Sequence, residues 1–311
     1  MIFARPSLFV LVSLASFAVA GCSADSDSTA QSSADDASTS SEDSSSDAAT
    51  SDGATTTDGG SDGATGITPL PAGPYSIVYA GTEVGIDMRT ASEATFDSNG
   101  LTGYKASDDE HPELGTNQHK EVFSDGKIMI GRWAGGKTGG KFYNVGGTGL
   151  IDVAANAGFH YAIGVGNSPL PSTGKVTYTL AHKTSVTRGD GSVAPGTLTG
   201  SLGANYAGAA SQIGFSFTLT IGTDTYNITT TGGAADPSTS SAMFTDSIKG
   251  AFSTNISLTG PLCSAGGSCS AGVDGFVGGA DGDRVGLVIH LYAGGGGTPT
   301  SLSVAAEFEK E

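Results

Sequence analysis

Large apolar residues recur at every second position along much of the C-terminal two thirds of the chain. The run GFSFTLTI (214–221) places Phe215, Phe217, Leu219 and Ile221 on one side, and serine and threonine on the other. Because successive side chains of a strand point to opposite faces, this pattern predicts a strand with one buried and one wet face. The turn at 222–224 leads into TYNITTT, so the two runs together predict a β-hairpin.

The same alternation recurs in several other short runs. They are FHYAIGV, KVTYTLA, AFSTNISL, VGLVIHL and SLSVAAEF, together with GTLTGSLGANY and the run from Ile128. Turn residues separate them, and the high glycine content, 49 of 311 residues, disfavours long helices. Many one-faced strands need closure or a facing sheet. We therefore predict an all-β chain: an eight-stranded antiparallel β-barrel at 127–311, preceded by a small N-terminal β appendage at 67–126.

The first 22 residues, MIFARPSLFVLVSLASFAVAGC, have the pattern of an export signal. Arg5 precedes an apolar run that ends at Ala20 and is too short for an ordinary transmembrane helix. The ending VAGC resembles the lipobox of bacterial lipoproteins, whose cysteine is acylated. We expect a signal peptide at 1–21 and a lipid on Cys22 that anchors the chain to a membrane; a plain signal peptide with an incidental cysteine is the alternative. Ser23 directly follows the cysteine, with no Asp there, and by resemblance to Gram-negative sorting this favours the outer over the inner membrane, on either its periplasmic face or the cell surface.

Residues 22–66 form a low-complexity segment rich in Ser, Thr, Ala, Asp and Gly. The segment lacks aromatic and large aliphatic residues, so it cannot bury enough apolar area to offset the entropy of ordering, and we expect a disordered acidic linker. It holds ten of the 31 acidic residues, and the whole chain has a formal net charge of −17. That charge argues against a nucleic-acid partner, because phosphate binding depends on Lys and Arg.

Cys263 and Cys269 are the two cysteines left after Cys22. Five small residues separate them, and an exported chain meets an oxidising environment, so we expect a disulfide. A metal site is the competing interpretation, but neither a second cysteine pair nor a nearby histidine supplies its remaining ligands. The sequence predicts no metal and no cofactor.

The segment GRWAGGKT, Gly131 to Thr138, fits the phosphate-binding pattern G-x-x-x-x-G-K-[ST]. A working phosphate loop needs a strand before it and a helix after it, so that the helix N-terminus faces the phosphates. Here a strand precedes the segment, but a glycine-rich and then extended sequence follows. We predict no nucleotide binding.

Several segments together resemble the C-terminal β-barrel of transferrin-binding-protein-B-like bacterial lipoproteins. The matching positions are the Gly-Arg-Trp of residues 131–133, Pro171, Gly174, Tyr178, Gly275, Phe276, Gly278, Gly286 and Leu287. The resemblance covers about 127–311. It implies an eight-stranded barrel that the Gly-Arg-Trp strand opens, a reduced handle at 67–126, and display from a lipid anchor. Members of this family bind host proteins or haem, but no ligand-contacting residue can be carried over to this chain.

The histidines give only weak indications of a site. His111 and His119 lie in the polar run 108–121, DDEHPELGTNQHKE, which we expect to be a loop and which is a weak candidate for ligand binding. An exposed, hydrated loop is the competing interpretation. His160 and His290 lie opposite the apolar faces of their strands, so we expect them to be solvated.

Trp133, the only tryptophan, lies opposite in parity to Ile128 and Ile130, whereas Arg132 shares their parity. A bulge at Gly131 would turn Trp133 inward, and we predict that bulge and a buried tryptophan.

Catalytic motifs are missing: the sequence has neither a G-x-S-x-G elbow nor H-E-x-x-H, and no free thiol remains. Paired carboxylates for glycoside hydrolysis could meet only in the fold. We predict a non-catalytic binding module for a protein or a small ligand, with haem as one candidate. The alternative is a structural envelope lipoprotein without a diffusible ligand.

Overall fold

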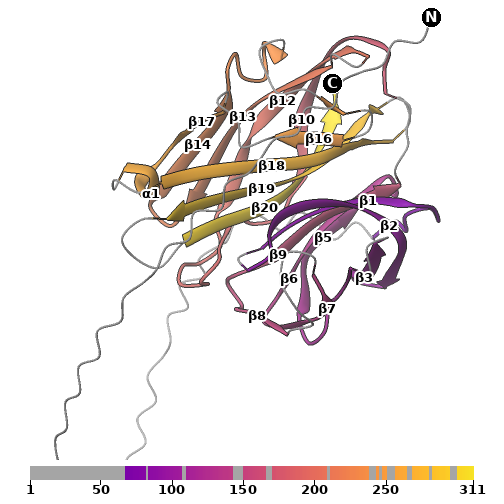
Figure 1. Ribbon diagram of the computed structural model, residues 1–311, viewed down its shortest axis with the longest axis vertical. Coiled ribbons are helices and arrows are strands. Elements are labelled where there is room, and N and C mark those ends of the chain that lie inside the picture. Colours follow the sequence, from indigo (N-terminus) through magenta and orange to yellow (C-terminus); the bar gives the residue numbers. More distant parts are fainter. Residues whose placement is uncertain are drawn as a thin grey trace, which may run out of the picture. The chain divides into compact units, whose positions relative to one another are not determined.

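Antiparallel β-strands make up most of the described part of the chain (Figure 1). The computed structural model describes residues 67–81, 83–106, 110–142, 150–165, 170–208, 211–237, 243–244, 247–250, 256–264, 268–279, 282–294 and 300–311. The expected signal peptide (1–21), the lipid site Cys22 and the linker 22–66 lie outside these residues. None of the described helices is long and apolar enough to span a bilayer.

The N-terminal sheet has nine strands in the order β5-β6-β9-β1-β2-β3-β4-β7-β8. The bounds are β1 Tyr75–Gly81, β2 Gly85–Asp97, β3 Gly100–Ala106, β4 His111–Glu113, β5 Gln118–Ser124, β6 Ile128–Ala134, β7 Gly136–Lys141, β8 Ile151–Val153 and β9 Phe159–Val165. Strands β2 and β3 pair as a hairpin through the turn at residues 98 and 99. The predicted polar loop at 108–121 is wrong in part, because β4 and the first four residues of β5 lie in it.

The C-terminal sheet has eleven strands and one short helix. Their bounds are β10 Thr173–Lys183, β11 Thr187–Arg188, β12 Thr197–Ala207, β13 Gln212–Ile221, β14 Asp224–Thr230, β15 Met243–Phe244, β16 Ser247–Gly250, β17 Ile256–Thr259, α1 Pro261–Ser264, β18 Ser268–Gly278, β19 Arg284–Gly294 and β20 Thr300–Lys310. The order is β15-β16-β18-β19-β20-β10-β12-β13-β14-β17, and β11 pairs with β20.

The C-terminal sheet forms a nearly closed barrel of eight antiparallel crossings, which confirms the predicted fold class. Seven crossings are the long strands β10, β12, β13, β14, β18, β19 and β20. The short strands β16 and β17 share the eighth, because β16 pairs with β18 and β17 pairs with β14. Side chains at alternate positions fill the interior, as expected for a barrel of this size. Phe215, Phe217, Leu219 and Ile221 of β13 are among them, as predicted.

The sheets divide between β9 and β10, not at residue 127. Strand β6 pairs with β5 and β9, and β9 pairs with β1, so residues 128–165 belong to the N-terminal sheet. The Gly-Arg-Trp strand therefore does not open the barrel, and the N-terminal element is larger than the predicted appendage. Alternation alone could not assign these strands, because it gives the period of a strand and not its neighbour.

Strands β1, β6 and β9 are buried on both faces. One face lies in the core of the N-terminal sheet with Trp133, and the other packs against barrel residues such as Phe276, Val288 and Ala305. Trp133 is fully buried, and its indole Nε1 donates a hydrogen bond of 2.8 Å to the Leu101 carbonyl. The predicted burial is confirmed, but the predicted bulge is wrong: β6 keeps continuous register with β9 through Gly131.

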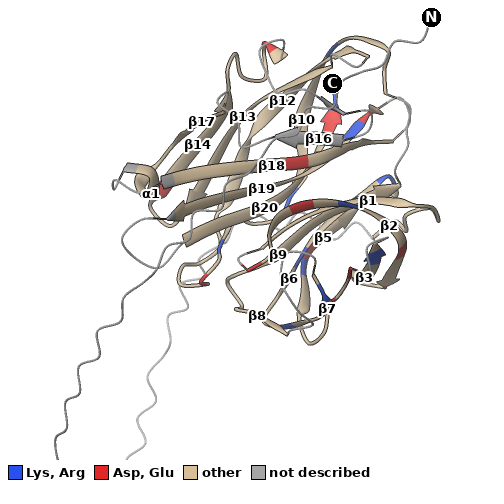
Figure 2. Cartoon of the chain, viewed as in Figure 1, with Lys and Arg blue, Asp and Glu red and all other residues tan. Residues whose placement is uncertain are grey.

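A disulfide joins Cys263 of α1 to Cys269 of β18, as predicted. Strand β17 leads directly into α1, and it pairs with β14, on the far side of the eighth crossing from β18. The disulfide therefore fastens one side of the barrel closure to the other. Charged residues are sparse over most of the barrel strands (Figure 2).

Candidate binding site

A cavity of about 60 Å³ opens among strand ends of the N-terminal sheet and the turn after β11. Its lining includes Val84, Thr138, Ile151, Phe159 and backbone of Gly189. A single water needs roughly 10–15 Å³ of such volume, so the cavity has room for several waters or for the end of a side chain. Its size suits a small group, and its walls are part apolar and part polar.

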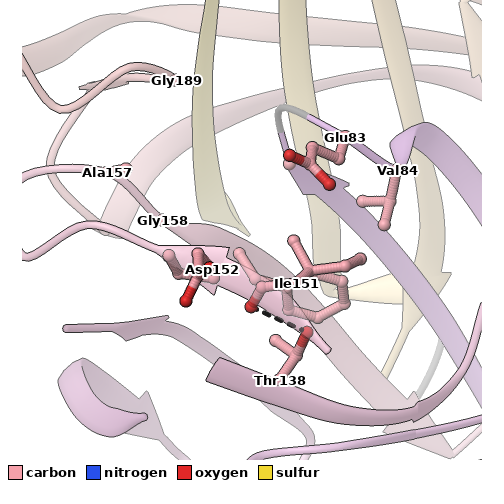
Figure 3. A pocket seen from close by; sticks show the side chains of 11 residues that line it. Glu83, Val84, Thr138, Ile151, Asp152, Ala157, Gly158 and Gly189 are labelled. Atoms are coloured by element: carbon pink, nitrogen blue, oxygen red, sulfur yellow. Dashed lines mark hydrogen bonds between the residues drawn. The ribbon is translucent and has the colours of Figure 1, made fainter. Parts of the chain in front are cut away.

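The wall residues come from opposite sides of the cavity (Figure 3). Glu83 and Val84 stand on one side, and Thr138, Ile151 and Asp152 stand on the other. The Thr138 hydroxyl donates to the Ile151 carbonyl at 3.4 Å, which leaves the carboxylates of Glu83 and Asp152 as the charged groups of the lining. Lys137 Nζ lies 3.1 Å from Asp152 Oδ1. The rim therefore has a small excess of negative charge, which favours a neutral or cationic group.

Arg132 lies behind the cavity wall and holds that wall in place. Its guanidinium is 3% exposed and donates at 2.7 Å to the carbonyl of Ala157, a residue of the lining. Two further hydrogen bonds, of 3.0 and 2.8 Å, run to the Glu121 carboxylate. Gly158 lies so close that a Cβ there would come within 2.5 Å of Arg132. Only glycine fits this point of the wall.

Glu121 stands in a β-bulge of strand β5, between Lys120 and Phe123, with a φ of 51°. This left-handed conformation is unfavourable for a residue with a side chain. The carboxylate also accepts hydrogen bonds from the backbone N–H and the hydroxyl of Ser185, both 2.9 Å. Burial raises the pKa of Glu121, but the hydrogen bonds from Arg132 and Ser185 outweigh it and leave the pKa below its ordinary value. Glu121 thus ties β5 to the segment between β10 and β11.

His160 fastens the same segment from the other side. It is fully buried, and its ring nitrogens lie 2.8 Å from the Thr184 hydroxyl and 2.7 Å from the Thr187 hydroxyl. His290 is also buried and lies 2.9 Å from the Ser303 hydroxyl. The predicted solvation of both histidines is wrong, because the strand faces that carry them lie against the other sheet. Burial lowers the pKa of His160 well below its ordinary value and that of His290 to about 4.

A second polar cluster joins the two sheets near the β5–β6 turn. Arg284 of β19 donates from Nε to Asp125 at 2.9 Å and lies 3.4 Å from Glu307, and Lys127 pairs with Asp283 at 2.6 Å. Glu307 is 1% exposed, and burial followed by repulsion from Asp125 raises its pKa to about 8. The cluster is satisfied mainly within the protein, so we regard it as structural.

A third cluster surrounds Glu110, which is buried in the N-terminal sheet. Its carboxylate accepts hydrogen bonds from the hydroxyls of Tyr79 and Tyr104, at 2.7 and 2.9 Å, and from Nε of Arg89 at 2.7 Å. Burial raises the pKa of both tyrosines, so they stay protonated. No sequence pattern pointed to this cluster, because its members lie on β1, β2 and β3 and just before β4.

The weak ligand candidates His111 and His119 lie on strands β4 and β5. His119 is largely buried, and its Nε2 is 3.3 Å from Asp97. Within the described ranges, no three His, Cys, Asp or Glu side chains form a group that could hold a metal ion. The GRWAGGKT segment runs through β6 and β7, two strands, so it lacks the helix that a phosphate loop requires.

Comparison with known proteins finds similar solved structures but no matching sequence. No family model and no curated protein sequence matches this chain. Among solved structures, it is similar to a double mutant of the vaccine antigen transferrin binding protein B from Haemophilus parasuis Hp5 (8% identity, 77% of this chain, 45% of that chain, TM-score 0.36). It is also similar to isotype 1 transferrin binding protein B from serogroup B Neisseria meningitidis (11% identity, 77% and 44% coverage, TM-score 0.34). The chain spans less than half the length of these structures. Both matched structures are named as transferrin binding protein B, the family that the sequence motifs resemble.

Proposed function

We propose that this chain is a lipid-anchored lipoprotein of the outer membrane whose β-domain is a non-catalytic binding module. The observation that carries the proposal is the order of parts in the sequence: an export signal, a lipobox cysteine at position 22, an acidic low-complexity segment and a strand-rich domain. A flexible segment between an anchor and a folded domain gives that domain reach from the membrane. Display of a binding surface is the activity that such an arrangement serves.

The cavity supports a ligand that inserts a small group. Its room and its mixed walls suit the end of a side chain of a partner protein, or a small molecule with an apolar part and a neutral or cationic end. The Arg132 and His160 contacts hold the surrounding turns together, so the site is formed before a ligand arrives. Preformed sites lose less entropy on binding.

The anchor is tested by growing cells with an alkyne-tagged fatty acid and isolating the protein. The wild-type chain should carry the tag and sediment with membranes, whereas Cys22→Ser should lose both properties. Retention of the tag in Cys22→Ser would contradict acylation at that residue. Protease treatment of intact cells then decides between the two faces of the outer membrane.

The binding role is tested by site-specific photo-crosslinking in cells with the full chain. A photoreactive amino acid replaces Glu83 at the cavity rim in one variant and Glu93, an exposed residue of β2 outside the cavity, in the control. We expect a discrete adduct from position 83 and none from position 93. Absence of any adduct at 83, together with an envelope defect on deletion of the gene, would favour the alternative of a structural lipoprotein.

Haem is a separate candidate ligand and has a direct test. Mixing the purified chain with hemin should shift and sharpen the Soret band of free hemin, and His119→Ala should change the position of the shifted band if this histidine is an axial ligand. An unchanged spectrum in that variant would remove His119 from the candidates, and the parallel His111→Ala variant tests the other histidine.

A further inference from the structure

The outer face of the barrel over β12, β13, β14 and β17 carries a regular array of short hydroxyl side chains. These strands lie side by side (Figure 1). Their inward residues, such as Leu198, Phe217 and Ile228, belong to the barrel core, so the intervening residues point outward. The outward set, here named the hydroxyl face, is Thr197, Thr199, Ser201, Ser216, Thr218, Thr220, Thr225, Asn227, Thr229, Ser257 and Thr259.

Strand register arranges these side chains in three rows across the sheet. The first row is Thr197, Thr220 and Thr225; the second is Thr199, Thr218, Asn227 and Thr259; the third is Ser201, Ser216, Thr229 and Ser257. Neighbouring strands lie about 4.8 Å apart, and alternate residues along a strand lie about 6.8 Å apart. All eleven side chains are exposed or half-exposed. The face is thus a two-dimensional lattice of ten hydroxyl groups and the amide of Asn227.

The hydroxyl face carries no charge. Asp224, at the turn into β14, is the only charged residue of the four strands, and their ribbons are otherwise tan in Figure 2. Protein surfaces normally hold about a quarter to a third of charged residues, with both signs interspersed. An uncharged face of this extent offers no complement to a phosphate, an anionic lipid or a charged protein surface.

The segment 231–237 borders the lattice at its third row, because a Cβ on Gly233 would come within 2.7 Å of the Ser216 hydroxyl oxygen. Gly203 and Gly214 face each other at the next position, and a Cβ on either would come within 2.1 Å of a backbone carbonyl, that of Ala234 or of Gly233. The segment 231–237 therefore lies directly on the sheet there. The lattice therefore has a raised border along one side.

We infer that the hydroxyl face binds an extended, uncharged polysaccharide. Each threonine presents a methyl group beside a hydroxyl that both donates and accepts, and a sugar ring presents C–H groups beside hydroxyls with the same capacity. The strand spacing is close to the length of one sugar unit in an extended glycan, so successive units meet successive strands. Threonine side chains are stiff on a strand, so little side-chain entropy is lost on binding.

Affinity from this face depends on chain length. A single hydrogen bond contributes only about 1 kcal/mol net, so one sugar unit binds weakly. A chain that crosses the four strands repeats the contact and gains by effective concentration. This surface lies apart from the cavity and does not depend on the proposed ligand of that site.

The experiment uses the full chain purified in a sugar-free detergent. Affinity electrophoresis through gels that contain hydroxyethyl cellulose, laminarin or dextran reports binding to uncharged polysaccharides of three linkages, and polygalacturonate serves as the charged comparison. We expect retardation by at least one uncharged polymer and none by polygalacturonate. Cello-oligosaccharides or laminari-oligosaccharides, matching the polymer bound, should compete better as they lengthen to about four units.

Two variants test the face itself. Thr199→Lys with Asn227→Lys, both exposed, should weaken binding about tenfold, and Thr199→Val with Thr218→Val, which removes hydroxyls but keeps shape, should weaken it too. Ser98→Lys with Asn99→Lys, in the exposed β2–β3 turn, is the matched control and should bind normally. Identical circular dichroism of all variants establishes folding. The inference would be overturned if none of the three uncharged polymers retarded the protein, or if the lysine variant bound as well as the wild type. It would also be overturned if the hydroxyl face bound ice, seen as inhibition of ice growth, and no polysaccharide.

Discussion

Removal of Glu121 should destabilise the protein more than removal of its partner Arg132. Glu121→Ala leaves the Arg132 guanidinium, 3% exposed, without its carboxylate, while one good hydrogen bond to Ala157 remains. Arg132→Met leaves a carboxylate whose side chain is 33% exposed and still accepts two hydrogen bonds from Ser185. The two substitutions break the same ion pair, but only Glu121→Ala leaves a buried charge without its partner.

The magnitudes follow from burial. Removing one partner of a buried ion pair costs about 3–5 kcal/mol, and water near the half-exposed Glu121 places Glu121→Ala at about 3 kcal/mol. Arg132→Met loses charge-assisted hydrogen bonds, but water can replace them at Glu121, so we expect a cost of about 1–2 kcal/mol. The double variant should lose less unfolding free energy than the sum of the two single variants, because no unpaired Arg132 guanidinium is then left in the core.

Urea unfolding followed by the fluorescence of Trp133 measures these differences. Trp133 is the only tryptophan and is fully buried, so its emission should shift to longer wavelength when the core opens. The midpoint should fall in the order wild type, Arg132→Met, Glu121→Ala, at a common slope. A larger loss of unfolding free energy in Arg132→Met than in Glu121→Ala would refute the reasoning. It would mean that an unpaired Glu121 carboxylate costs more stability than an unpaired Arg132 guanidinium.

Three further predictions concern titration and the disulfide. His160 and His290 have pKa values lowered from 6.5 by burial, so stability present above pH 6.5 should decline as the pH falls towards about 4; His290→Asn should flatten this decline in urea midpoints measured between about pH 7 and 5. Glu307 has a pKa raised from 4.5 to about 8. The stability that its protonated form contributes is therefore fully present below pH 4.5 and is lost as the pH rises through 8. Glu307→Gln should therefore match the wild type near pH 4.5 and exceed it by about 5 kcal/mol above pH 8, and equal midpoints there would contradict the shift. Replacing Cys263 and Cys269 by serine should cost about 2 kcal/mol in the same assay, and an unchanged midpoint under oxidising conditions would show that the bond adds nothing to stability.

Strand periodicity predicted the barrel well where each strand has one wet face. Strand β13 is the clearest case, since Phe215 and Phe217 lie in the core and Ser216 lies outside, as its alternation requires. Strand β6 shows why the same reasoning failed elsewhere. Both of its faces are buried, and Arg132 sits on an apolar face because Glu121 neutralises it across a bulge in the neighbouring strand. The sequence around Arg132 does not reveal that Glu121 is its ion-pair partner.

The candidate site was beyond prediction for a related reason. The cavity wall combines β1, β7, β8 and the turn after β11, whose proximity depends on sheet order. His160 seemed solvated by parity, yet the face it occupies meets Thr184 and Thr187 of the next sheet. Parity tells which side of a strand a residue takes. It does not tell whether that side meets water or another sheet.

The bulge at Glu121 also affects whether two copies of this protein can associate edge to edge. Strand β5 is an outermost strand of its sheet, and a regular strand in that position would offer its unpaired N–H and C=O groups to a second molecule. The left-handed turn at Glu121 breaks that repeat, and the carboxylate is already engaged by Ser185. A neighbour therefore cannot extend the sheet there. Copies of this domain at high local concentration therefore do not polymerise through this edge.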